Sequence, residues 1–96
     1  DGVSPETATM PPDWEKFSRL YYIGELTAVV PDLHDLAVAK AVAGRDKDAS
    51  WVAALLRHRM IDLQRLIERL HALDASRHDI ARLVAWAERR SEEAGS

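Results

Sequence analysis

Cysteine is absent from this chain of 96 residues. Its absence excludes disulfide bonds and thiolate metal ligands. No run of residues approaches the ~20 apolar residues that a membrane-spanning helix needs. The first dozen residues also lack the basic and apolar regions of a signal peptide. These absences predict a cytoplasmic protein with no membrane partner.

An excess of positive charge is also absent, because the net charge is -3 at pH 7. Strong binding to nucleic acid needs cations that neutralise phosphates, so this balance speaks against it and against a DNA-binding helix-turn-helix. Four arginines still gather in the middle of the chain: Arg57, Arg59, Arg65 and Arg69. We interpret them as a solvated face balanced by Asp62 and Glu68, with an RNA-facing stripe as the alternative.

Apolar residues make up 47% of the chain and charged residues 30%, as in ordinary globular proteins. Residues 1–16 have no hydrophobic period and are rich in proline, which predicts an extended loop. Residues 17–30 contain two runs of aromatic and β-branched types separated by Gly24 and Glu25. This pattern predicts two short strands joined by a turn.

The segment 31–96 has the periodicity of helices and forms a helical subdomain in our prediction. Asp32 can cap a helix over residues 33–43, and Gly44 follows at the position where many helices end. The polar residues 45–48 are interpreted as a link to a second helix.

Two further helices are expected. Asp62 opens the third, and Ser76 with Asp79 three residues later predicts a capping-box start for the fourth. Two strands followed by about four helices make a mostly helical α+β fold. Because two strands alone are barely stable, we predict that the chain is the C-terminal part of a larger domain. An N-terminal sheet half is then its missing partner.

A lone cation near the end of an apolar helix, Lys40, is the first candidate for chemistry. The helix dipole favours a cation at that end, and capping explains Lys47 and Asp48 at the start of the next helix. Residue chemistry alone therefore favours a structural role for these side chains.

Two runs of sequence nevertheless carry a resemblance, namely residues 35–40 (DLAVAK) and 44–48 (GRDKD). Together with residues 1–7 and 11–14, they look like the signature of an uncharacterised bacterial family of nucleotidyltransferase-like proteins. That family is similar in turn to the AbiE-type toxin nucleotidyltransferases. Those toxins also have a lysine on a helix, then an arginine, then a basic residue and an aspartate at the next helix.

The resemblance implies roles for four residues. Lys40 and Asp48 would be catalytic, with Asp48 orienting Lys40 or the acceptor. Lys40, Arg45 and Lys47 would contact the nucleotide. It also implies that the parent protein binds Mg²⁺ and a nucleoside triphosphate through a Gly-Ser motif and an Asp-x-Asp pair. Metals and cations there offset the charge on the transferred group.

The Gly-Ser loop and the strand-borne Asp-x-Asp pair are absent from these runs, and Trp51 stands where the toxins tend to place a further aspartate. We therefore expect this chain alone to be inactive. The parent would transfer a nucleotidyl group from a nucleoside triphosphate to an acceptor such as tRNA. The alternative is a non-catalytic interaction module that binds an antitoxin-type protein or forms a homodimer. The four histidines lack ligand-like spacing, so no metal site is predicted.

Overall fold

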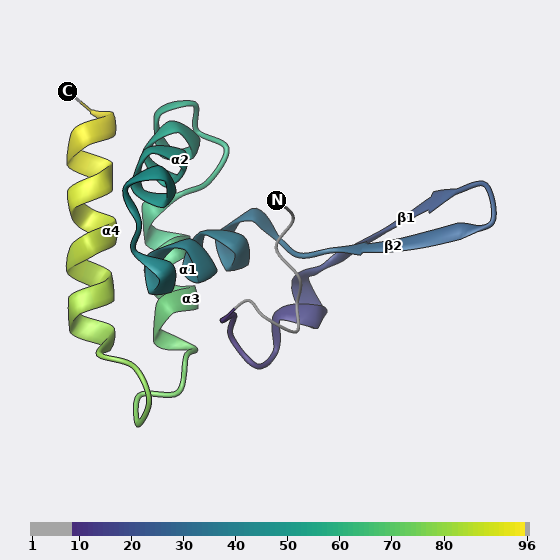
Figure 1. Cartoon of the computed structure of the whole chain (residues 1–96), viewed down its shortest axis with the longest axis horizontal. Helices are drawn as coiled ribbons and strands as arrows, with labels where there is room; N and C mark the ends of the chain where they lie inside the picture. Colours follow the sequence, from purple (N-terminus) through teal and green to yellow (C-terminus); the bar gives the residue numbers. More distant parts are fainter. Residues whose placement is uncertain (1–8, 96) are drawn as a thin grey trace.

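The protein forms a β-hairpin followed by four helices in the computed structural model, which describes residues 9–95. The elements in chain order are a 3₁₀ turn η1 (Trp14–Phe17), strands β1 (Arg19–Ile23) and β2 (Leu26–Val30), and helices α1 (Leu33–Ala43), α2 (Asp46–Arg57), α3 (Leu63–His71) and α4 (Ile80–Ala94). The helices gather together, and the hairpin extends away from them (Figure 1). The mostly helical α+β class predicted from the sequence is confirmed.

The hairpin is a two-stranded antiparallel sheet. Arg19 lies opposite Val30 at its base, and Ile23 lies opposite Leu26 at its tip. Gly24 in the turn has a φ of 62°, a left-handed conformation that glycine adopts without steric strain. Every residue of both strands is exposed. The two predicted strands and their turn are confirmed, and none of residues 9–95 covers either face of the hairpin.

The segment before the hairpin differs from the predicted extended loop. Trp14–Phe17 form a 3₁₀ turn, and the first strand begins at Arg19 rather than at residue 17. Phe17 stays out of the strand because its ring lies beneath the guanidinium groups of Arg65 and Arg69, 4.8 and 4.2 Å from the ring centroid. The part of the predicted loop at residues 1–8 lies outside the described residues.

Helix α1 begins and ends where its local signals predict. The Asp32 carboxylate accepts a hydrogen bond from the backbone N–H of His34 at 2.8 Å, which is an N-cap contact. Gly44 has a φ of 64°, and its N–H donates to the carbonyl of Lys40. This left-handed glycine ends the helix and turns the chain toward α2.

Helix α2 begins earlier than predicted. It starts at Asp46, so most of the expected link at residues 45–48 is helical. Arg45 is the N-cap residue, and its backbone N–H donates to the carboxylate of Asp48 at 3.3 Å. Consecutive charged residues are typical of loops. Here the acidic ones stabilise the first turn of a helix, where they interact favourably with its positive dipole end and accept a backbone hydrogen bond.

The starts of the last two helices give one confirmation and one correction. Asp62 caps α3, as predicted, by accepting a hydrogen bond from a backbone N–H of the first turn. The capping-box prediction for α4 is wrong, because Asp79 itself is the N-cap. Ser76 instead donates its hydroxyl to Asp74 at 2.6 Å in the preceding loop.

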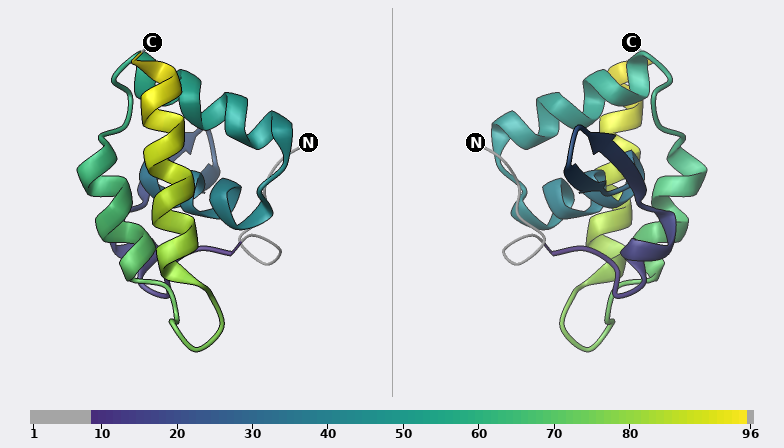
Figure 2. Two further views of the ribbon diagram at one scale, coloured as in Figure 1. Left: turned by 90° about the vertical axis from the view of Figure 1, so that its left-hand side faces the viewer. Right: turned by 90° about the vertical axis from the view of Figure 1, so that its right-hand side faces the viewer.

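One core joins the apolar stripes of the four helices. Helix α4 packs against α2 and α3, and α1 packs against the same two helices. The bulky residues that are fully buried include Val38, Val52, Leu66 and Leu70. Helix α4 lies at the end of the molecule opposite the hairpin (Figure 2). The core therefore fixes the corner between α1 and α2, and the hairpin contributes nothing to it.

Candidate functional site

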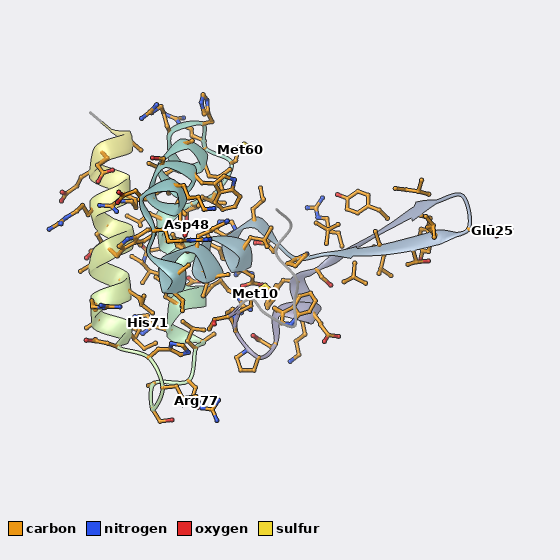
Figure 3. All side chains as sticks on the ribbon, viewed as in Figure 1. Met10, Glu25, Asp48, Met60, His71 and Arg77 are labelled. Atoms are coloured by element: carbon orange, nitrogen blue, oxygen red, sulfur yellow. The ribbon has the colours of Figure 1, made fainter. Side chains whose placement is uncertain are left out.

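The corner between α1 and α2 brings three of the four candidate residues together. Lys40 lies in the last turn of α1, Gly44 reverses the chain, and Arg45 caps α2. Both cations reach Asp48, which lies in the first turn of α2 among the helices (Figure 3). We call Lys40, Arg45 and Asp48 the Asp48 cluster.

Two cations share the Asp48 carboxylate. Lys40 Nζ lies 3.2 Å from Oδ1. The side chain of Arg45 donates through Nε to Oδ2 at 2.7 Å and through Nη2 to Oδ1 at 3.3 Å. With the backbone N–H of Arg45 as a further donor, both carboxylate oxygens have two polar partners. The carboxylate therefore fixes the positions of the two cations relative to each other.

The Asp48 carboxylate and its two cations differ in burial. Asp48 is 1% exposed, whereas the side chains of Lys40 and Arg45 are 19% and 57% exposed. Hydrogen bonds from Arg45 hold the pKa of Asp48 below its ordinary value, because they favour the ionised carboxylate. Two cations and one carboxylate leave one net positive charge on the accessible side. This arrangement can attract and orient an anion such as a phosphate group.

Lys47, the remaining candidate, does not join the Asp48 cluster. It is exposed in the first turn of α2, and its ammonium group makes no ion pair within residues 9–95. It is consequently available to a ligand but is not held in place as Lys40 is.

A second cluster, which the sequence reasoning missed, surrounds Arg69 of α3. Its Nε lies 2.6 Å from Oδ1 of Asp35 in α1, and its Nη2 lies 2.9 Å from Oδ1 of Asp13 before the hairpin. The Phe17 ring stacks on the same guanidinium group. Arg69 is only 6% exposed, so the prediction that it belongs to a solvated arginine face is wrong. We call Arg69, Asp35, Asp13 and Phe17 the Arg69 cluster.

The Arg69 cluster joins segments that are distant in sequence. Burial raises the pKa of Asp35, whereas the hydrogen bond from Arg69 lowers the pKa of the more exposed Asp13. Helical spacing is the signal that could have located Arg69, because position 69 falls on the same face of α3 as Leu66, which is buried. Its contacts hold the segment that precedes the hairpin against α1 and α3.

His34 makes a third polar contact, between the starts of α1 and α3. Its Nε2 accepts the backbone N–H of Asp62 at 2.9 Å, so Nδ1 carries the proton that faces Asp32 at 2.7 Å. His34 and Met60 line two clefts of about 780 and 510 Å³. Neither cleft is lined by a member of the Asp48 cluster, so the clefts are separate from the candidate site.

No group of three or more histidine, aspartate or glutamate side chains within residues 9–95 could hold a metal ion. Asp48 already has two cations as partners. In the same range, no helix is both long enough and apolar enough to cross a membrane.

Comparison with known protein families gives one result for this chain. The sequence model of the family described as "Nucleotidyltransferase of unknown function (DUF6036)" matches residues 1–91. The match includes both clusters and the hairpin. Neither the curated proteins nor the solved structures provide a match.

Proposed function

Because the chain belongs to this family of nucleotidyltransferases of unknown function, we propose that the Asp48 cluster binds the phosphates of a nucleoside triphosphate during nucleotidyl transfer. The observation that carries the proposal is a buried carboxylate holding two partly exposed cations at one corner. The family description does not favour the alternative of a non-catalytic interaction module.

Each member of the cluster has its own role in the proposal. Lys40 and Arg45 contact phosphate oxygens, since ammonium and guanidinium groups are the usual partners of phosphate. Asp48 is a positioning residue, because its burial beneath the two cations keeps it away from the nucleotide. Lys47 contributes a looser contact from its exposed position in the same turn.

The reaction is a displacement at the α-phosphorus. A hydroxyl oxygen of the acceptor forms the new bond to this phosphorus, and the bond to the bridging oxygen of pyrophosphate breaks. Pyrophosphate leaves with the electron pair, and the hydroxyl proton passes to a base or to solvent. Cations that contact the phosphates lower the barrier by offsetting charge that builds on the leaving group.

Mg²⁺ would supply further charge neutralisation in the parent protein. The carboxylates of the two clusters do not fit this ion: Asp48 is committed to two cations, and Asp35 and Asp13 are committed to Arg69. The proposal therefore assigns no magnesium ligand among residues 9–95.

The hairpin fits a sheet of the same enzyme. Its exposed apolar side chains lie on both faces, for example Tyr21 and Tyr22 on adjacent positions of β1. A strand that is apolar on both faces is typical of a sheet covered on both sides. We propose the N-terminal sheet half expected from the sequence as the partner that receives the hairpin. Two strands are barely stable alone, so this partner would stabilise the hairpin.

A tRNA is the acceptor that we propose from the resemblance to the AbiE-type toxins, and a toxin role in the cytoplasm would follow from it. An assay of nucleotide transfer from labelled nucleoside triphosphates, with an added pool of tRNA, tests this acceptor directly. Labelled nucleotide should appear on tRNA, and its appearance on protein instead would contradict the choice.

Lys40→Ala tests the site. In the full-length protein with labelled nucleoside triphosphates, this change should reduce transfer by about 100-fold or more, since a charge that contacts the phosphates is lost. Lys16→Ala is the matched control, because Lys16 is an exposed lysine of η1. It should retain wild-type transfer. Equal rates for Lys40→Ala and the wild type, with both folded by circular dichroism, would refute the assignment.

A further inference from the structure

The Lys40 ammonium group has a second neighbour besides Asp48. Its Nζ lies 5.5 Å from the centroid of the Trp51 ring. Trp51 follows Asp48 by three residues on α2, so both side chains point to the same side of the helix. The ring is partly buried against the core, which restricts its own movement. Lys40 is therefore held by a carboxylate and by an aromatic face.

An aromatic face restrains a cation without cancelling its charge. A carboxylate in place of the ring would neutralise the Asp48 cluster, which now carries one net positive charge. The lysine ammonium has three N–H donors, and Asp48 is its one hydrogen-bonding or ion-pairing partner within residues 9–95. Donors consequently remain for a phosphate group.

Restraint matters because the lysine stem is flexible. A free lysine side chain loses conformational entropy when it is fixed against a ligand. A lysine that is already held between two neighbours has lost part of this freedom before the ligand arrives. Preorganisation of this kind increases affinity without adding a contact.

We propose that Trp51 is a positioning residue of the phosphate site: its ring face holds Lys40 in place and leaves the positive charge available to the nucleotide. The inference rests on the proposed function, because it specifies how the same site is organised. Trp51 itself need not touch the nucleotide.

Triphosphate binding by three tryptophan variants tests this role. The probe is ATP, titrated by calorimetry into the full-length protein. Trp51→Leu should weaken ATP binding by about tenfold, since the aliphatic side chain offers no ring face. Trp51→Phe should restore the dissociation constant to within about threefold of wild type, because phenylalanine keeps a ring face there.

Trp86→Leu is the matched control. Trp86 of α4 is also partly buried against the core, and its ring faces a different cation, Arg90, at 5.0 Å. Its loss should lower the melting temperature as Trp51→Leu does, but leave ATP binding unchanged. A purely structural role for Trp51 predicts instead that both leucine variants weaken binding equally, and that outcome would overturn the inference.

The results separate this inference from the function on which it rests. If Lys40→Ala abolishes ATP binding and Trp51→Leu leaves it at wild-type strength, Trp51 is not a positioning residue and the phosphate site stands. If Lys40→Ala binds ATP as the wild type does, the phosphate site is wrong and the role of Trp51 falls with it. If Lys40→Ala and Trp51→Leu both weaken ATP binding and Trp51→Phe restores it, the phosphate site and the positioning role of Trp51 are both supported.

Discussion

The Asp48 and Arg69 clusters are built from the same side-chain chemistry with the charges reversed. One carboxylate holds two cations in the first, and one guanidinium holds two carboxylates in the second. The cations of the Asp48 cluster remain partly exposed, whereas Arg69 and Asp35 are buried. This difference supports our proposal that the first cluster presents charge to a ligand, and the second cluster joins segments of the fold that are distant in sequence.

Positions along the chain support the same division. The three members of the Asp48 cluster lie within eight positions of each other, at one helix corner. Arg69 instead bonds to Asp35 and Asp13, which are 34 and 56 positions away. A contact across such a separation holds distant segments of the chain together, while a local contact shapes one surface. Stability and ligand binding in variants of each cluster test this division.

Arg69→Met should produce the largest loss of stability. It leaves the buried Asp35 carboxylate without its cation, and breaking a buried ion pair in this way costs about 3–5 kcal/mol. Urea unfolding of the variant and the wild type measures this loss in the free energy of unfolding. Adding Asp35→Asn should recover part of the loss, because the unpaired charge is then removed. A loss below about 1 kcal/mol would show that Arg69 does not join the fold.

The pH dependence of stability should distinguish the two buried carboxylates. The pKa of Asp48 is lowered in the folded protein, so its stabilising contribution is present above about pH 4 and is lost as the pH falls through the folded pKa. The pKa of Asp35 is raised, so its contribution has the opposite sign and declines as the pH rises through that pKa.

Asp48→Asn should therefore lose less stability than the wild type between pH 5 and pH 3, and Asp35→Asn should lose more. Urea unfolding across this range measures both slopes. If Asp48→Asn loses as much stability on acidification as the wild type, the Asp48 carboxylate does not hold its cations in solution.

Lys47→Ala should have the smallest effect. Lys47 is exposed and has no ion pair within residues 9–95, so its removal should change the free energy of unfolding by less than about 0.5 kcal/mol. ATP affinity should fall by no more than about threefold, since a loosely held lysine loses more side-chain entropy on binding than Lys40 does. A loss as large as that of Lys40→Ala would place the main phosphate contact at Lys47.

Local signals explain how much of the fold could be predicted. The bounds of α1 followed from Asp32 and Gly44, because caps act on their own helix. The proximity of Lys40, Arg45 and Asp48 could likewise be predicted from the sequence, since only a short turn separates their helices. The capping residue of α4 was misassigned because Ser76 and Asp79 are both good caps, and only the hydrogen bonds decide between them.

Long-range contacts explain what could not be predicted. Arg69 is charged and lies near other arginines, so composition favours a solvated face, and its partners Asp35 and Asp13 are found only after folding. The contact of the Trp51 ring with Lys40 depends on the angle between α1 and α2, which no local pattern specifies.

The most direct test of the central claim is a titration of the protein with ATP followed by amide nuclear magnetic resonance. The backbone amides of residues 44–48 should shift strongly and saturably, since they surround the proposed phosphate site. The amide resonances of residues around Arg69 should not shift, and the shifts at residues 44–48 should vanish in Lys40→Ala. Saturable shifts that avoid residues 44–48, or that persist in Lys40→Ala, would contradict the assignment of the phosphate site to the Asp48 cluster.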